Sequence, residues 1–297
     1  MIGTLPVRVL MEDVIETFEN ISPAFRNALA GELFFGDDKS NQNLKPNIQY
    51  HFSDSLPINE IAKITSDHKF HLYENFCQFL WCITYSLMVQ FDWLTTNQNS
   101  HKIEVNQYDR AIKLLDAAFL LKKPNYDQRT FLELPNSEII NSVEEKEYVI
   151  ATNAVFCVSM TFILLHEFAH HFYGHLDTAN DSLDEYKNDE RKADNFAIDT
   201  LLGETLQTNR YWNELGIIFA LIGLTLLDKD LDGGPIHPSS DERLNNALNR
   251  MISDDAWGYA AMSLIIWNQK YNLGVEIPAV EGTYKELFIS TVNKINS

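Results

Sequence analysis

The chain has 297 residues, a length that suits one compact domain or two closely joined lobes. Apolar residues make up 45% and charged residues 22%, close to globular averages, which excludes disordered, collagen-like and coiled-coil proteins. Asp and Glu number 42 against 23 Lys and Arg, and the net charge of −19 repels phosphate backbones and anionic lipid surfaces. We therefore expect no nucleic-acid partner and no membrane association.

The cysteines and the apolar runs indicate the cellular compartment. Three cysteines are too few and odd in number for a disulfide framework, so we expect small buried thiols. The N-terminus has no apolar run of signal-peptide length. The longest apolar stretches, 154–165, 215–227 and 256–267, are shorter than the roughly 18 residues of a membrane span. These features predict a cytoplasmic protein.

The first 70 residues have a mixed pattern, and the rest of the chain is helical in pattern. Residues 6–10 and 48–52 are typical of short strands, with a polar loop at 36–47 between them. Apolar residues then recur at helical spacing over 73–94 and 106–122. We predict a mainly α protein with a small N-terminal β element, divided into a mixed α/β region, 1–70, and a helical domain, 71–297.

Several helices are predicted after a loop at 124–141. The pattern Ser-x-x-Glu, a capping box, begins a long helix over 142–173 and a second helix over 182–203. A turn-rich loop at 228–238 contains Gly-Gly-Pro. Further helices are predicted over 215–227, 241–251 and 257–268.

The sharpest chemical signal is the run His166-Glu167-Phe168-Ala169-His170 on the long predicted helix. Two histidines four residues apart lie about 40° apart around a helix, so both imidazoles can bind one metal ion. Glu167 lies beside that face, within reach of a water on the metal, and is the candidate catalytic base. A catalytic zinc site has three protein ligands and one open position, so a third ligand is expected.

The next predicted helix supplies that ligand. Glu190 follows His170 after nineteen intervening residues, and a glutamate on an adjacent antiparallel helix completes a His₂Glu zinc site of the thermolysin type. Asp194, one turn further on the same face, is placed to accept the free N–H of a ligand imidazole. Two alternatives stay open: a buried helix with locally bonded histidines, and a solvated charged face around Glu190.

The other histidines carry weaker signals. At 100° per residue, His171 and His175 point away from the metal side of a regular helix, and His171 is expected in the core or against a partner. Gly174 leaves the direction of His175 open. His237, in the turn-rich loop, suits three roles: a transition-state donor, a removable fourth zinc ligand, or a helix cap.

Three blocks in order carry a resemblance to a known family. They are an apolar helix ending in HEFAHH, then ERKADNFA, and a downstream HPSSDERL. The combination resembles the phage-exclusion Lit family of bacterial metallopeptidases and, more distantly, the HtpX and CAAX-prenyl-protease clan. It covers about 73–251, and it implies a gluzincin-like helical metalloprotease core that binds Zn²⁺. The membrane helices of the HtpX relatives are missing, which favours the soluble Lit-like branch.

Carried over position by position, the resemblance implies three zinc ligands: His166, His170 and Glu190. Glu167 would be the base, Asp194 would support a ligand histidine, and His237 and Arg243 would belong to the rim of the site. Lit-like proteins cleave elongation factor Tu once a phage capsid peptide is bound. The resemblance therefore implies a protein substrate, a phage-derived activator and a role in abortive infection.

The chemistry expected from these residues is metal-assisted peptide hydrolysis. Zinc acidifies water and polarises the scissile carbonyl, and Glu167 moves the proton to the leaving amine. The donor for the oxyanion stays open among several residues: His237, Arg243, Tyr173, Tyr186 and Tyr211.

Three functions remain from the sequence: a Lit-type host-targeting protease, a regulatory zinc peptidase that cleaves a repressor or toxin-system partner, and a zinc-stabilised binding protein. Glu167 disfavours the third, because a structural zinc site needs no base. An open cytoplasmic protease would damage its own cell. We therefore expect a latent enzyme, with the loop of His237 over the metal and residues 1–70 as the surface that an activator binds.

Overall fold

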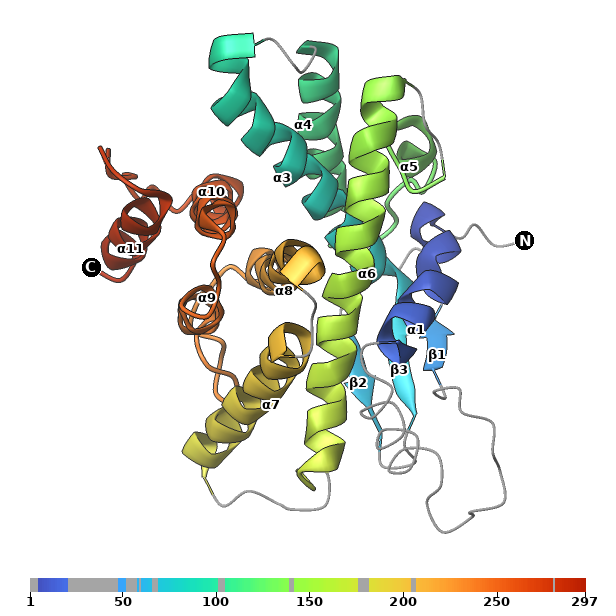
Figure 1. Ribbon diagram of the computed structural model, residues 1–297, viewed down its shortest axis with the longest axis vertical. Helices are drawn as coiled ribbons and strands as arrows, with labels where there is room; N and C mark the ends of the chain where they lie inside the picture. The colour runs from blue at the N-terminus through green and yellow to red at the C-terminus, as the bar shows by residue number, and fades with distance from the viewer. Residues whose placement is uncertain are drawn as a thin grey trace.

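The computed structural model describes residues 5–20, 48–51, 58, 60–65, 69–100, 105–138, 142–175, 182–203, 207–279 and 281–297. The described chain is mainly helical with one small three-stranded sheet near its N-terminus, which confirms the predicted fold class (Figure 1). The predicted polar loop at 36–47, part of the surface expected to bind an activator, lies outside the described residues.

The N-terminal segment is helical where a strand was predicted. A 3₁₀ helix, η1 (Pro6–Leu10), runs directly into α1 (Met11–Glu19). The prediction of a strand over 6–10 was wrong because Pro6 stands in the first turn of a helix, where its missing N–H costs nothing. Side chains of α3 (Glu74–Ser100) take the free backbone donors: Glu74 and Gln78 accept from Leu5 and Val7, each at 3.0 Å.

The sheet has the order β1-β3-β2, formed by β1 (Ile48–His51), β2 (Ala62–Ile64) and β3 (Phe70–Tyr73). β1 pairs parallel with β3, and β2 pairs antiparallel with it. Only the first of these strands was predicted. The prediction that helical structure begins at residue 71 was wrong, because strands of three or four residues are too short to show a clear period of two.

Each helix predicted after the sheet is present, although α8 begins eight residues before the predicted start at 215. α6 runs through the middle of the molecule beside α1, α3, α7 and α8 (Figure 1). The predicted loop at 124–141 contains a short helix, and a last helix was not predicted. The helices are α4 (Val105–Leu120), α5 (Thr130–Glu133), α6 (Val143–Phe172), α7 (Leu183–Gly203), α8 (Gln207–Leu227), α9 (Ser240–Leu248), α10 (Asp254–Tyr271) and α11 (Tyr284–Ile295).

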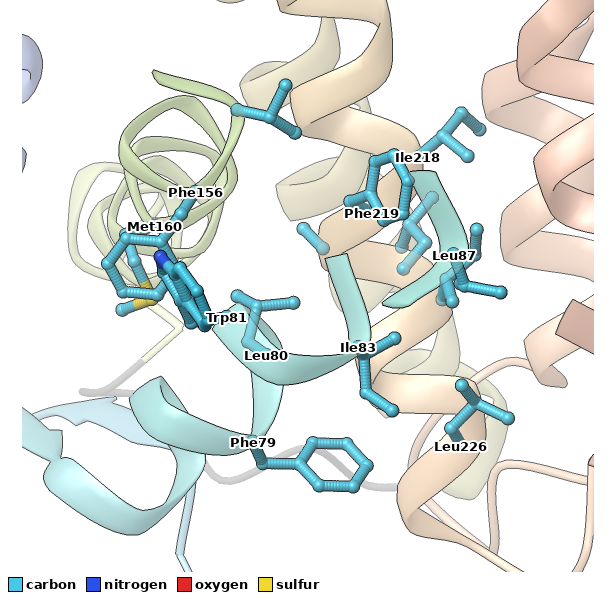
Figure 2. Packing of buried hydrophobic residues seen from close by; sticks show 14 of the residues in the cluster. Phe79, Leu80, Trp81, Ile83, Leu87, Phe156, Met160, Ile218, Phe219 and Leu226 are labelled. Carbon is cyan, nitrogen blue, oxygen red and sulfur yellow. The ribbon is translucent and has the colours of Figure 1, made fainter. Parts of the chain in front are cut away.

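One hydrophobic core joins the described N-terminal residues to the helices. Buried apolar side chains from Leu5 to Phe288 belong to a single cluster. Figure 2 shows its centre, where α3, α6 and α8 meet: Phe79, Leu80 and Trp81 of α3, Phe156 and Met160 of α6, and Ile218 and Phe219 of α8. All three cysteines are free and buried, as predicted. The division of the chain at residue 70 stays a prediction.

α8 lies unusually close to α6, and this contact fixes the helix that carries the HExxH run. A Cβ added at Gly216 of α8 would stand 2.3 Å from Cγ1 of Val158 on α6. The hydroxyl of Ser159 donates to the carbonyl of Gly216 at 2.8 Å. Glycine is therefore required at this crossing because any side chain would push the two helices apart.

Two helices are long and apolar enough to cross a membrane by length and composition: Glu145–Phe172 within α6 and Asn209–Leu227 within α8. The uninterrupted apolar runs within these helices are shorter, because polar residues interrupt them. In both helices 67% of the most apolar window is buried inside the protein. Core helices of soluble proteins pass the same test, so the location of the protein stays a prediction.

Candidate metal centre and active site

The end of α6 and the middle of α7 bring three metal-binding side chains together. His166 and His170 are one turn apart on α6, and their Nε2 atoms are 3.2 Å from each other. Glu190 of α7 lies between them, with Oε2 at 3.3 Å from Nε2 of His166 and Oε1 at 3.2 Å from Nε2 of His170. These three residues could hold a metal ion, each offering one ligand atom.

The spacing of the three residues can be compared with that of a real metal site. Ligand atoms bound at about 2.0–2.1 Å around a tetrahedral ion lie about 3.3 Å from one another. The two imidazole nitrogens here are 3.2 Å apart, and each lies 3.2 to 3.3 Å from one of the two Glu190 oxygens. With one ligand atom from each residue, all three atoms lie within 4.8 Å of one another. His166 and Glu190 are also buried, with 8% and 9% of their surface exposed. The donor set and its dimensions therefore suit an ion of the size of zinc.

The electrostatics of the cluster favour a cation. Burial alone would lower the pKa of His166, but hydrogen bonds with Asp194 and Glu190 outweigh it and raise that pKa to about 10. Burial also opposes ionisation of Glu190, yet hydrogen bonds from the surrounding histidines hold its pKa far below the ordinary value. A metal cation and a proton compete for the same imidazole nitrogen. Carboxylates that stabilise the protonated imidazole therefore also favour a bound metal cation.

Asp194 and Arg243 lie behind His166. Nδ1 of His166 donates to Oδ1 of Asp194 at 2.9 Å, and the Arg243 guanidinium binds both carboxylate oxygens at 2.7 Å. Although burial opposes it, the charge of Arg243, followed by the bond from His166, lowers the pKa of Asp194 to about 2. This arrangement orients the imidazole of His166 with Nε2 towards Glu190. Arg243 was predicted at the rim, and it also lines the cleft.

Glu167 is held by the sheet. Its Oε2 accepts the backbone N–H of Ile64, the last residue of β2, at 3.1 Å. Burial raises the pKa of this carboxyl above its ordinary value, and the two histidines of α6 oppose the rise. The carboxylate lines the same cleft as His166 and Glu190, so the candidate base stands beside two of the candidate metal ligands.

His237 reaches the same cluster from the loop between α8 and α9. Its Nδ1 lies 2.8 Å from Oε2 of Glu190, and 44% of its side chain is exposed. It therefore stands between the candidate ligands and solvent. The three tyrosines considered as oxyanion donors, Tyr173, Tyr186 and Tyr211, are exposed, and none is among the described residues that line the cleft.

The cleft has a volume of about 350 Å³. Apolar side chains of α6 and α8 line it, together with polar residues of the β2 segment and the loop after α8, and His166, Glu167 and Glu190 line it too. The apolar lining residues include Phe162, Ile163, Leu224 and Leu227, and the polar ones include Glu60, Lys63 and Asp228.

His175, whose direction the helical pattern left open, lies next to the site. Gly174 has φ +72°, and the N–H of His175 donates to the carbonyl of His170 at 2.8 Å. This left-handed turn folds His175 back over the end of α6, and its Nδ1 lies 3.1 Å from Nδ1 of His170. A glycine directly after a predicted helix is the signal that could have placed it. His171 packs near Phe168 instead, with ring centres 6.2 Å apart.

Comparison with known proteins agrees with the chemistry of this cleft. The family model described as Peptidase U49 matches residues 70–262, more than half of the chain, from β3 into α10. The protein is therefore a peptidase. It belongs to the peptidase U49 family, and the match contains the HExxH run, Glu190 and His237. A search of the curated proteins and a search of the solved structures each found no match.

Proposed function

We propose that this peptidase is a zinc-dependent endopeptidase of the gluzincin type, with His166, His170 and Glu190 as zinc ligands and Glu167 as the catalytic base. One observation carries the proposal: the two histidine Nε2 atoms lie 3.2 Å apart, each 3.2 to 3.3 Å from an oxygen of Glu190, and Glu167 lines the same cleft as His166 and Glu190. A zinc site that only stabilises structure needs no such base and no open side.

When bound, zinc supplies Lewis acidity, which polarises the scissile carbonyl and lowers the pKa of water. The residues of this chain do the rest. Asp194, fixed by Arg243, holds His166 in the tautomer that presents Nε2. Glu167 takes a proton from the attacking water and gives it to the leaving amine nitrogen. The Ile64 N–H keeps that carboxylate in place while the proton moves.

Oxyanion stabilisation is assigned to His237 in this proposal. Its ring lies at the mouth of the cluster, 2.8 Å from Glu190, and an imidazole N–H can donate to an oxygen that becomes negative. The Arg243 guanidinium is already bound to Asp194 through two nitrogens. His237 is therefore the better candidate of the two.

The free strand edge beside the cleft suits a polypeptide substrate. β2 is an edge strand of the described sheet, and Ala62 and Lys63 line the cleft. The Ile64 N–H points away from β3 towards Glu167, so the free edge of β2 faces the reacting groups. An extended peptide binds to such an edge through main-chain hydrogen bonds, which a small molecule cannot do.

The test uses protein purified without chelator. Wild type should contain about one zinc per chain, and His166→Ala and Glu190→Ala should each lose most of it. Glu167→Gln should keep the fold and the zinc but lose at least about a hundredfold in cleavage rate, the usual span for a lost general base. Full zinc retention in both ligand variants would refute the ligand assignment. Equal cleavage by Glu167→Gln and wild type would refute the base.

The resemblance to the Lit family adds a substrate and an activator to the proposal. Elongation factor Tu in the cytoplasm is the proposed substrate, and a phage-derived peptide is the proposed trigger of a latent enzyme. The net charge of −19 favours a basic activator, because opposite charges speed encounter. Purified enzyme is incubated with elongation factor Tu, with and without lysate from phage-infected cells. Cleavage only with the infected lysate supports latency, and equal cleavage in both arms contradicts it.

A further inference from the structure

The two candidate ligand histidines differ in what holds their second nitrogen. Nδ1 of His166 meets a carboxylate directly, that of Asp194 at 2.9 Å. Nδ1 of His170 meets a second imidazole, that of His175, at 3.1 Å. His175 in turn places Nε2 at 3.3 Å from Oδ1 of Asp189. The second histidine therefore reaches its carboxylate through one intervening ring.

The direction of these hydrogen bonds follows from the position of the candidate metal ligands. Nε2 of His170 faces Glu190 at 3.2 Å, so it must offer its lone pair to an ion there. The ring proton is then on Nδ1, and this N–H donates to the lone pair on Nδ1 of His175. The proton of the neutral His175 ring is left on Nε2, directed at the Asp189 carboxylate.

The backbone builds this chain of contacts at both ends. The left-handed Gly174 turns the chain so that His175 lies over His170, joined to it by a backbone hydrogen bond of 2.8 Å. Asp189 precedes Glu190 on α7, so consecutive residues reach the two sides of the His170 ring. Lys192 pairs with Asp189 at 2.8 Å, just as Arg243 pairs with Asp194.

We infer that His175 and Asp189 are positioning residues of the metal centre, which fix the tautomer and ring orientation of His170. The inference rests on the proposed function, since it assigns a role around the same ion. The parallel with the other ligand supports it: each histidine leads to a buried carboxylate that a basic side chain neutralises in turn. Partners of this kind raise the basicity of a ligand and contribute strongly to metal affinity.

The experiment measures zinc affinity by competition with a chelator in wild type, His175→Ala, Asp189→Ala and Asp189→Asn. His171→Ala is the matched control, because it removes a histidine from the same turn that packs near Phe168 instead. His175→Ala and Asp189→Ala should weaken zinc binding by about 10- to 100-fold. Asp189→Asn keeps an acceptor oxygen for the His175 N–H and should recover part of the loss. His171→Ala should bind zinc as wild type does.

Two further readouts separate positioning from simple stabilisation. The visible spectrum of the Co²⁺-substituted protein should change in His175→Ala and not in His171→Ala, because only the first alters a ligand ring. The thermal midpoint of the metal-free protein should be similar in both. A lower midpoint with unchanged zinc affinity and Co²⁺ spectrum would overturn the inference. If His175→Ala does not fold, Asp189→Asn decides in the same way. Wild type that binds no zinc would refute the proposed function, whereas equal zinc affinity in all variants would refute only the inference.

Discussion

The Asp194 carboxylate accepts hydrogen bonds from two partners: His166 donates to one oxygen, and Arg243 donates to both. Its pKa in the folded protein is lowered to about 2 from the ordinary 3.8. Between these values the unfolded chain binds more protons than the folded one. The carboxylate therefore contributes stability that is complete above about pH 5 and is lost as the pH falls towards 2.

The size of this effect can be measured against Asp194→Asn. The full contribution is roughly 2 kcal/mol, and about 1 kcal/mol of it should disappear between pH 6 and pH 3. Urea unfolding of both proteins at the two pH values, in the presence of a chelator, gives the difference in free energy of unfolding. A gap between wild type and variant that is the same at pH 6 and pH 3 would contradict the lowered pKa.

Single side chains of the site were predictable to different degrees. Helix periodicity alone places His166 and His170 on one face, and their Nε2 atoms are 3.2 Å apart. Glu190 required a second helix to pack beside the first, which local spacing cannot determine. Helical geometry alone left the direction of His175 open, because it ends at Gly174, and the left-handed conformation that this glycine adopts sets where His175 lies.

The helices were predicted well and the strands poorly, for a physical reason. A helix of 20 or more residues repeats its apolar pattern several times, whereas β2 has three residues and β3 four. The close crossing of α6 and α8 could not be predicted from the sequence either. A glycine in an apolar run does not reveal which neighbour approaches it.

That crossing leads to a prediction about stability. Gly216→Ala should lower the free energy of unfolding by about 1–3 kcal/mol, because the new methyl meets the stiff side chain of Val158. Gly203→Ala is the control, since a Cβ at that helical glycine would meet no atom of the described residues within 4 Å. Urea unfolding with matched slopes compares the two. The idea fails if Gly216→Ala is as stable as Gly203→Ala.

Metal binding should affect the entire fold, because the candidate ligands come from two helices. An ion held by α6 and α7 binds the folded state and stabilises it by about 2.7 kcal/mol when free zinc is at 100 times its Kd. Removal of zinc should then lower Tm by roughly 4 °C for a chain of this size.

Scanning calorimetry with and without chelator checks this expectation, and His166→Ala serves as the control that should not respond. If the Tm of wild type is the same with and without chelator, this would argue against a site that joins the two helices. Because one core includes both the N-terminal helices and α11, we expect a single transition in each scan.

The anchor of Glu167 is a main-chain N–H, that of Ile64, and this determines where mutations are tolerated. Every amino acid except proline carries this donor, so a substitution at position 64 that fits the buried space of Ile64 does not release the carboxylate. A side-chain donor in the same place would be lost by almost any substitution. The constraint falls instead on the pairing of β2 with β3, where Ile64 is opposite Phe70. An insertion or deletion of one residue there would turn the wrong N–H towards the glutamate. The residues of this strand can therefore change in identity, but not in number.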